Sequence, residues 1–413
     1  MLKKYLHKLL KKYLSFYINK SDSVLELSPN NEKLFKDNKN YSESSDFILL
    51  NGIIHYESDI QKNLQELYNK ITSDTRVIIV YYSSLWKPFI KLSSYLKLRK
   101  KTPEENWISH EDVENFLLLT NFEIVRRDSK IILPIYIPLL SAFFNRILAP
   151  LPLLKYFSLV NIVIARALKK EENLKTVSIV VPARNEEGNI EEIVKSLPKL
   201  SDDDELIFIE GNSTDNTWEK IKSVADKYKN EKNIITGHQE GKGKGDAVRK
   251  GFLLATKDIF MIYDADMTVP AEDLIKFYNA IKTGKGEFIN GSRLVYPMEK
   301  QAMRFFNIIG NKFFASGFSF LIGQRFKDTL CGTKVISRKN YIKLSANRNY
   351  FGDFDPFGDF DLIFGATKLG LKIIEIPIRY KERIYGNTNI QRWKHGMILF
   401  KMLFFAMRKI KFL

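Results

Sequence analysis

Hydrophobic and polar positions form alternating blocks along the second half of the chain, and these blocks predict strands and helices in turn. Short apolar runs predict strands near residues 177–182, 205–210, 233–237, 258–263 and 287–290. Helical periodicity predicts helices near 187–198, 214–229, 244–256 and 271–283. Such alternation is typical of a parallel, doubly wound sheet, which binds ligands at the carboxyl ends of its strands.

The first half shows a shorter series of the same kind. Apolar runs predict strands in SVLEL, DFILLNGIIHYE and RVIIVYYS, with a helix from about 59 to 71 and a helix and strand in WISHEDVENFLLLTNFEIVRRD. In the first 20 residues the apolar positions follow one helix face, with lysines opposite. This face fits either membrane contact or packing against the domain that follows.

The length of 413 residues exceeds one typical core and predicts two domains. We expect a first domain at 1–130, an apolar connecting segment at 131–173, a main domain at 174–395 and a basic amphipathic tail at 396–413. Four prolines and two basic residues interrupt the apolar stretch 131–165, which predicts a packed connection, an interfacial segment or a mixture of both. No apolar run reaches the roughly 18 residues of a membrane-spanning helix.

The net charge of +17 predicts an anionic partner. The first 20 residues carry six lysines and no acid, and residues 368–413 carry eleven basic residues against two glutamates. Apolar residues accompany both basic ends, which favours an anionic membrane surface, and no nucleic-acid-binding motif accompanies the charge. Cys331 is the single cysteine, which excludes an intrachain disulfide and fits a reducing compartment. We therefore expect a peripheral protein on the cytoplasmic face of a membrane.

IFMIYDADMTVPAED, residues 259–273, provides the candidate metal site. Its apolar residues predict a buried strand that ends in Asp264 and Asp266. Residues two apart on a strand project to the same side, so the two carboxylates can bind one Mg²⁺ or Mn²⁺ ion. The alternative is a pair of solvated carboxylates that cap the following helix.

Seven motifs occur in the order VSIVVPARNEEGNI, EGNSTDNT, GKGKGDAVRKGF, DADMTVPAED, NGSRL, DTLCGTKVISR and FGDFDLIFGATKLGLKIIEIPIRYKERIYGNTNI. Together they resemble glycosyltransferase family 2, and most closely its dolichyl-phosphate mannosyltransferase branch. The resemblance implies a GT-A fold and metal-assisted, inverting transfer of a sugar from a nucleotide-diphosphate sugar to a lipid acceptor, for which polyprenyl phosphate is expected.

The resemblance also assigns the donor site. Asp266 is expected to be the firmer metal ligand, and Thr268 stands where relatives often carry a glutamine ligand. Gly211 follows Glu210 where the family usually has two aspartates, which leaves the nucleotide base open. The residues expected to bind the nucleotide sugar are Pro182, Ala183, Arg184, Glu186, Glu210, Asp215, Lys244, Asp246 and Asp264.

Two alternatives remain for the acceptor. A phosphate acceptor needs a clamp of positive charge, for which the resemblance offers Arg293, Arg304 and Arg383. A sugar hydroxyl in glycan or glycolipid assembly needs a general base, for which Asp359 and Asp361 are the candidates. Residues 298–325 predict an amphipathic helix pair at the membrane interface, with a core helix as the alternative.

Residues 20–130 resemble a class I methyltransferase, which binds S-adenosylmethionine. In that family a glycine-rich loop follows the first strand, but this chain has SPNN there. We therefore expect a degenerate, methyltransferase-like domain, with a bifunctional methyltransferase and glycosyltransferase as the alternative. His55 is expected to be structural. The predicted fold class is α/β throughout: a GT-A, Rossmann-like nucleotide-sugar domain with a mostly parallel sheet, preceded by a smaller Rossmann-like domain.

Overall fold

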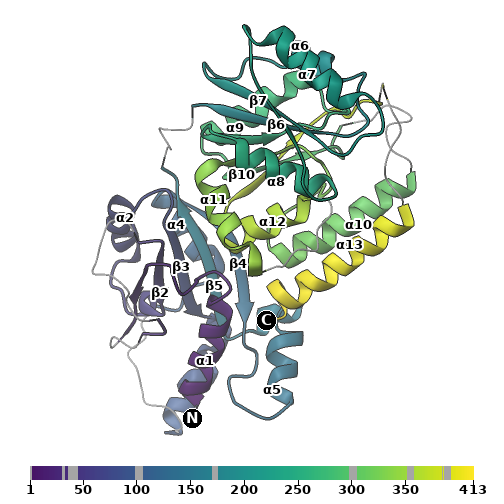
Figure 1. The fold of residues 1–413 in the computed structure, drawn as a ribbon. Helices are drawn as coiled ribbons and strands as arrows, with labels where there is room; N and C mark the ends of the chain where they lie inside the picture. The colour runs from purple at the N-terminus through teal and green to yellow at the C-terminus, as the bar shows by residue number, and fades with distance from the viewer. Residues whose placement is uncertain are drawn as a thin grey trace. The chain divides into compact units, whose positions relative to one another are not determined.

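A computed structural model divides the chain into two compact units, and Figure 1 colours it from purple at the N-terminus to yellow at the C-terminus. Unit 1 comprises Met1–Lys170 together with Met407–Leu413, and unit 2 comprises Glu171–Ala406. The structure describes residues 2–29, 33–35, 45–97, 106–169, 175–296, 305–350, 358–383, 385 and 392–413. Each unit has its own sheet and its own hydrophobic core.

Unit 1 is built on a five-stranded sheet in the order β1-β2-β3-β5-β4. The strands are β1 (Val24–Leu27), β2 (Phe47–Asn51), β3 (Arg76–Tyr82), β4 (Phe122–Lys130) and β5 (Val160–Ala167). The first three are parallel, whereas β5 lies between β3 and β4 and runs antiparallel to both. The helices include α1 (Leu2–Leu14), α2 (Ile60–Lys70), α3 (Lys87–Tyr95), α4 (His110–Leu119) and the short α5 (Leu140–Ala142).

Strand β5 corrects the predicted domain boundary, because it lies inside the segment 131–173 that was expected to connect the domains. All eight of its residues are buried, so both faces of the strand are covered. A strand buried in this way shows no polar alternation, and its sequence resembles any other apolar run. Residues 160–167 are thus part of the first unit.

The apolar face of α1 packs inside unit 1. Leu6, Leu10, Tyr13 and Leu14 are all buried. The structure therefore supports the packing interpretation of the first 20 residues, because a buried helix face is not exposed to a membrane.

Residues 407–413 belong to unit 1 and correct the prediction of a separate tail at 396–413. Helix α13 (Arg392–Ala406) takes up the first part of that range, and the π-helical turn η8 (Met407–Lys411) follows. The Lys411 ammonium pairs with the buried carboxylate of Asp128 at 2.9 Å, and Lys130 Nζ donates to the Lys411 carbonyl at 2.9 Å. This segment is therefore anchored by buried charges.

The loop after β1 is held by a buried acid. The Glu26 carboxylate accepts hydrogen bonds from the backbone N–H groups of Leu34 at 2.7 Å and Phe35 at 2.9 Å. Leu34 and Phe35 are thus held against the end of β1, where a methyltransferase would place its cofactor loop. The resemblance of residues 20–130 to class I methyltransferases stays a prediction.

His55 has a structural environment. Its Nε2 accepts a hydrogen bond from the backbone N–H of Tyr82 at 2.9 Å, and its Nδ1 lies 2.6 Å from the carbonyl oxygen of Asn106. Both ring nitrogens are therefore engaged with backbone groups, in agreement with the structural role that was expected.

Unit 2 is built on a seven-stranded sheet in the order β12-β10-β11-β9-β6-β7-β8. The strands are β6 (Val177–Ala183), β7 (Asp204–Glu210), β8 (Asn233–His238), β9 (Ile259–Ile262), β10 (Phe288–Ser292), β11 (Lys334–Ser337) and β12 (Ile373–Pro377). Only β11 is antiparallel to its neighbours. The five predicted strands and the α/β fold class with mostly parallel sheets are confirmed.

The helices of unit 2 connect these strands and cover the sheet. They are α6 (Ile190–Ser196), α7 (Thr217–Tyr228), α8 (Lys244–Leu254), α9 (Leu274–Lys282), α10 (Phe305–Ile322), α11 (Arg338–Ala346), α12 (Asp359–Lys368) and α13. Buried residues of α6, α7 and α9 share one hydrophobic core with strands β6, β7 and β9. The four helices predicted between 187 and 283 are confirmed.

Helices α10 and α13 lie side by side (Figure 1), with the rings of Phe314 and Phe400 5.0 Å apart. The predicted helix pair within 298–325 is therefore corrected: α10 is one helix, and its partner is α13. Ile309, Phe313, Met397, Phe400 and Phe404 remain exposed on this pair. Among the helices that the structure describes, none combines the length and apolar character needed to cross a bilayer.

Candidate active site

The order of the strands identifies a topological switch point in unit 2, where open α/β sheets form their ligand-binding crevice. From β6 the chain proceeds outward through β7 and β8, then returns to β9 on the other side of β6. Ligands of open α/β sheets bind where the strand order reverses in this way, at the carboxyl ends of the strands. The segments that follow β6 and β9 contain Glu186, Asp264 and Asp266, and they meet at this point.

Arg383 joins both segments. Its Nη1 pairs with Glu186 at 3.0 Å, and its Nη2 pairs with Asp266 at 2.8 Å. The backbone N–H of Lys381 donates to the Thr268 carbonyl at 2.9 Å, which holds the strand-like segment after β12 against the turn after β9. Three residues that are 80 or more positions apart in sequence thereby meet at one guanidinium.

The DAD motif forms a turn and not the end of a strand. Strand β9 ends at Ile262, and Met267 has a left-handed φ of 53°. Asp264 and Asp266 consequently face different partners: Asp264 pairs with Lys244 at 2.5 Å, and Asp266 pairs with Arg383. Thr268 orients Asp266, because its Oγ1 donates to the carboxylate at 2.9 Å.

Burial and charge shift the ionisation of these groups. Burial raises the pKa of Glu186 to about 7, with Asp266 adding to the effect and Arg383 opposing it. Burial alone would raise the pKa of Asp264, but the Lys244 ammonium outweighs it and holds that pKa below its usual value. The Asp264 carboxylate raises the pKa of Lys244 against the effect of burial. The crevice therefore contains one carboxyl that titrates near neutrality beside a firmly ionised pair.

Gly332 of the DTLCGTK motif lies directly against the Lys244–Asp264 pair. A Cβ atom at this position would overlap the Asp264 carboxylate and the Lys244 ammonium. Only a residue without a side chain leaves room for both groups. Gly332 therefore allows Lys244 and Asp264 to pair at this position.

The loops after β6 and β7 are linked through Asn185, which has a left-handed φ of 57°. Its backbone N–H donates to Ser213 Oγ at 3.0 Å, and its side-chain oxygen accepts from the Thr214 N–H at 2.8 Å. Asp215 accepts the Thr217 N–H at 3.1 Å, at the start of α7. Of the remaining predicted residues here, Ala183 ends β6, Pro182 is partly buried and Arg184 is exposed.

Glu210 forms hydrogen bonds within the protein at the end of β7. Its carboxylate accepts the Ser213 N–H at 2.5 Å and lies 3.0 Å from Nδ1 of His238. His238 in turn packs on Trp218, with 3.8 Å between ring centroids. Both carboxylate oxygens are thus used within the protein, and a contact to the nucleotide stays a prediction.

The GKGKG loop is closed by Asp246. The Asp246 carboxylate accepts the Gly241 N–H at 2.6 Å, so it stabilises the turn before α8. Gly245 at the start of α8 lies so close to Gly358, the left-handed residue before α12, that a Cβ on either would meet the other's backbone. The helix starts that carry Lys244 and Asp359 are therefore in direct contact.

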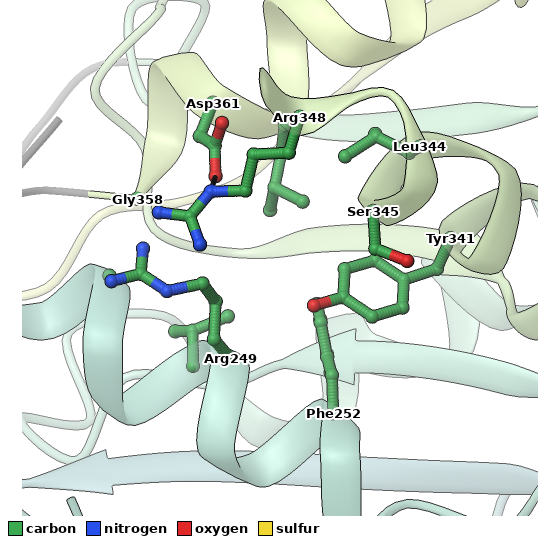
Figure 2. A pocket seen from close by; sticks show the side chains of 11 residues that line it. Arg249, Phe252, Tyr341, Leu344, Ser345, Arg348, Gly358 and Asp361 are labelled. Carbon is green, nitrogen blue, oxygen red and sulfur yellow. Dashed lines mark ion pairs between the residues drawn. The ribbon is translucent and has the colours of Figure 1, made fainter. Parts of the chain in front are cut away.

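The two general-base candidates occupy different surroundings. Asp359 is buried and pairs with Lys334 at 2.7 Å, and its charge helps to raise the pKa of Lys244. Asp361 pairs with Arg348 at 2.8 Å and lines a cavity of about 140 Å³ between α8, α11 and α12. Figure 2 shows the guanidinium groups of Arg348 and Arg249 directed toward this same space. Asp359 is thus the candidate that lies near the Lys244–Asp264 pair.

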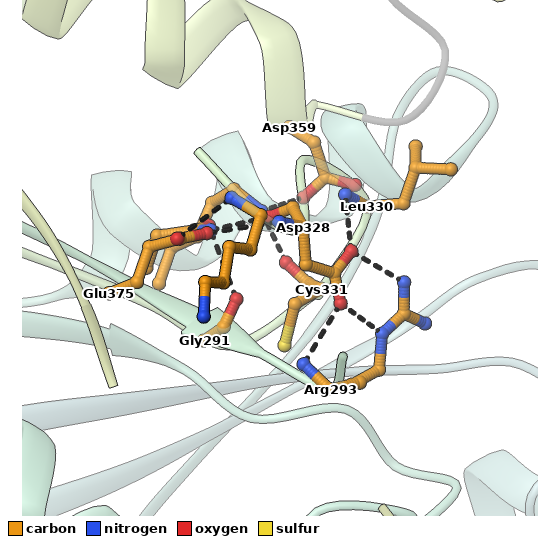
Figure 3. Close-up of polar contacts among 10 residues, drawn as sticks. Gly291, Arg293, Asp328, Leu330, Cys331, Asp359 and Glu375 are labelled. Carbon is orange, nitrogen blue, oxygen red and sulfur yellow. Dashed lines mark hydrogen bonds and ion pairs between the residues drawn. The ribbon is translucent and has the colours of Figure 1, made fainter. Parts of the chain in front are cut away.

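The Arg293 side chain is largely buried and pairs with a carboxylate of the protein. Its guanidinium makes a bidentate pair with Asp328, at 2.6 and 2.8 Å, and Asp328 is fully buried (Figure 3). The backbone N–H of Asp328 donates to Glu375 at 3.0 Å, which ties the loop after α10 to β12. This pair uses Nε and Nη2 of Arg293, and contact of the residue with a phosphate stays a prediction. Arg304, the second clamp candidate, lies outside the described residues.

Comparison with known proteins identifies the domain that carries this crevice. The sequence profile named "Glycosyl transferase family 2" matches residues 178–345. Residues 178–345 form a glycosyl transferase family 2 domain. The match spans β6 to α11 and includes both the DAD turn and Gly332.

Curated relatives resemble the family 2 part of the chain. Glycosyltransferase AglJ of Haloferax volcanii is 27% identical over 234 residues, covering 55% of this chain and 71% of the relative. Dolichol-phosphate mannosyltransferase of Pyrococcus furiosus is 36% identical over 121 residues, 29% of this chain and 33% of the relative. UDP-N-acetylglucosamine--dolichyl-phosphate N-acetylglucosaminyltransferase of Methanococcus voltae is 28% identical over 244 residues, 56% of this chain and 94% of the relative.

Among solved structures, glucosyl-3-phosphoglycerate synthase of Mycobacterium tuberculosis, in complex with Mn²⁺, UDP and glucosyl-3-phosphoglycerate, is similar with a TM-score of 0.42. It is 20% identical, and the match covers 57% of this chain and 80% of that one. A likeness of this size carries no conclusion about the substrate of this chain.

Three features of the family 2 site were not predicted from the sequence. These are the Lys244–Asp264 pair, the bridge from Arg383 to Glu186 and Asp266, and the space left by Gly332. Each joins segments that are distant in sequence, so local patterns carry no signal for it. The bond from Thr268 to Asp266 had a signal, since a threonine two residues after an acid commonly bonds to it.

Proposed function

We propose that the chain transfers a hexose from a nucleotide-diphosphate sugar to a polyprenyl phosphate with inversion at the sugar carbon. The observation that carries the proposal is the Arg383 bridge between Glu186 and Asp266, next to the Lys244–Asp264 pair. Two cations and three carboxylates meet where an α/β sheet binds its ligands. Relatives named for transfer to dolichyl phosphate support the acceptor class.

The cations suit the diphosphate of the donor. Both Lys244 and Arg383 are partly exposed, at 28% and 24% of their side chains, so an incoming phosphate can reach them. Arg383 offers a planar fork that matches phosphate oxygens, and the start of α8 adds backbone N–H groups. Donor binding would replace part of the internal ion pairs with contacts to phosphate.

Asp264 and Asp266 have the chemistry to hold Mg²⁺ or Mn²⁺, because both ions prefer carboxylate oxygens. Among the described residues no group of three or more metal-binding side chains occurs, so substrate oxygens and water would complete the ligand set. A bound ion would offset negative charge on the leaving diphosphate. Thr268 keeps the Asp266 carboxylate oriented for this role.

The ion pairs of Asp359 and Asp361, the two general-base candidates, favour a phosphate acceptor over a hydroxyl acceptor. Asp359 and Asp361 already bind the side chains of Lys334 and Arg348, and either would have to give up an ion pair to take a proton. A phosphate acceptor is anionic near neutral pH and needs no base. Transfer to a sugar hydroxyl is the second candidate, and the position of Asp359 near Lys244 is the observation in its favour.

A substrate panel tests the proposal. Purified protein with Mn²⁺ is given UDP- and GDP-sugars together with a short polyprenyl phosphate, the matching polyprenol, or a free sugar. We expect transfer to the phosphate alone, and Asp359→Asn should leave slow but measurable transfer. Abolished transfer in Asp359→Asn, or product on the alcohol or the sugar, would favour the second candidate.

A conservative arginine variant tests the bridge itself. Arg383→Lys keeps the positive charge but loses the planar guanidinium that can bind two phosphate oxygens at once. We therefore expect kcat/KM for the donor to fall roughly tenfold or more. Arg338→Lys is the matched control, because Arg338 is exposed and bonds to the Thr256 carbonyl at 2.9 Å. Equal activity of the two variants would remove Arg383 from the donor site.

A further inference from the structure

We propose that unit 1 carries a membrane-docking surface of its own, and that its partner is an anionic lipid bilayer. The surface consists of residues 84–96, 135–147 and 153–157. All of these residues belong to unit 1, whereas the exposed apolar residues of α10 and α13 belong to unit 2. The inference extends the proposed function, since a lipid-linked acceptor requires the enzyme to work at a bilayer.

The first part of this surface is helix α3 and the turn before it. None of the nine residues of α3 is buried. Leu85, Phe89, Leu92 and Leu96 follow the spacing of one helix face and are 54–63% exposed. A helix of a soluble domain normally buries such a face, but this face has no partner among the residues of unit 1 that the structure describes.

The second part is the stretch between β4 and β5. Leu139 is 89% exposed and Leu153 is 80% exposed, which are high values for leucine side chains. The Trp86 indole N–H donates to the Phe157 carbonyl at 2.9 Å, so the stretch adjoins the start of α3. The other exposed apolar residues of the stretch are Ile135, Tyr136, Ile137, Leu140, Phe143, Ile147, Tyr156 and Phe157.

The charges of the same segments specify the partner. Residues 76–103 and 129–170 contain no aspartate or glutamate. Lys87, Lys91 and Lys97 accompany the α3 face, and Arg146 and Lys155 accompany the other stretch. Apolar side chains beside lysine and arginine suit the interface of an anionic bilayer, where the basic groups reach the headgroups. A protein partner of matching shape would not require the complete absence of acids.

Fluorescence of a labelled cysteine tests the proposal on the full chain. Cys331 is fully buried, so a cysteine introduced by Leu153→Cys is the accessible site for an environment-sensitive dye. We expect a blue shift with vesicles that contain phosphatidylglycerol, and quenching by brominated lipid. Leu118→Cys is the matched control, because Leu118 is also exposed, at 68%, but lies on α4 outside the surface. Equal responses at the two positions, or none at either, would overturn the proposal.

A variant with aspartate in place of two apolar residues of the surface supplies the second readout. Phe89→Asp with Leu153→Asp should reduce vesicle binding roughly tenfold or more, because burial of these apolar side chains is lost. Leu118→Asp should bind as the wild type does. Transfer to a short, water-soluble acceptor should persist in both, which separates this proposal from the proposed function. If light scattering instead shows a dimer that the double variant dissociates, while vesicles have no effect, the surface joins two copies and the bilayer proposal is wrong.

Discussion

Replacement of Gly332 by alanine tests whether the space beside the Lys244–Asp264 pair is needed for activity. The added Cβ would lie 2.6 Å from Cγ of Asp264, whereas carbon atoms in contact normally stay about 3.5 Å apart or more. The carboxylate must therefore move by roughly 1 Å, and the Lys244 ammonium must move with it.

The size of this shift sets the expected effect. A misplacement of about 1 Å in a reacting site can lower the rate by about a hundredfold. The free energy of unfolding should change less, by about 1–3 kcal/mol, because the displaced atoms are the ends of flexible side chains. We therefore expect Gly332→Ala to fold, to bind the nucleotide weakly and to transfer sugar about a hundred times more slowly than the wild type.

The assay compares transfer rates at saturating donor with the thermal unfolding of each variant. Gly310→Ala is the matched control, since a Cβ there has no atom within 4 Å. A Gly332→Ala enzyme that works within a factor of about three of the wild type would refute the reasoning, because the pair would then tolerate displacement.

Two further predictions concern the carboxylates bound by Arg383. Asp266→Asn should lower transfer by about a hundredfold or more without unfolding the protein, and excess EDTA should abolish wild-type activity; full activity in either test would contradict a metal role here. Glu186 has its pKa raised to about 7 from 4.5 by burial, so its contribution to stability is complete below about pH 4.5 and is lost as the pH rises through 7. The melting temperature of the wild type relative to Glu186→Gln should thus fall between pH 5 and pH 8, and a constant difference would exclude the titration.

The sequence alone predicted the strands and helices that show a local pattern of apolar and polar residues. The alternation between 177 and 290 predicted the strands β6 to β10 and their helices, because each element repeats its own period. It did not predict β11, whose four residues are all buried and therefore show no alternation. Strand β5 was not predicted, for the same reason.

For the site, the sequence identified residues but not their partners. The motifs indicated Asp264, Asp266, Glu186 and Arg383, but they did not indicate that Arg383 pairs with Glu186 and Asp266. The assignment of Arg383 to the acceptor stays a prediction. Arg293 was likewise assigned to the acceptor, and the buried Asp328 that it binds is 35 residues away. Pairing between distant segments depends on how the sheet is ordered, which no single motif encodes.

The anchoring of residues 407–413 in unit 1 has a consequence for the order of folding during synthesis. Lys411 is 283 residues away from Asp128, and all of unit 2 lies between them. A ribosome must therefore produce the whole catalytic unit before the buried Asp128 carboxylate can receive this partner. Domains usually fold in the order in which they emerge. Here the unit that emerges first can be completed only after the second has been made.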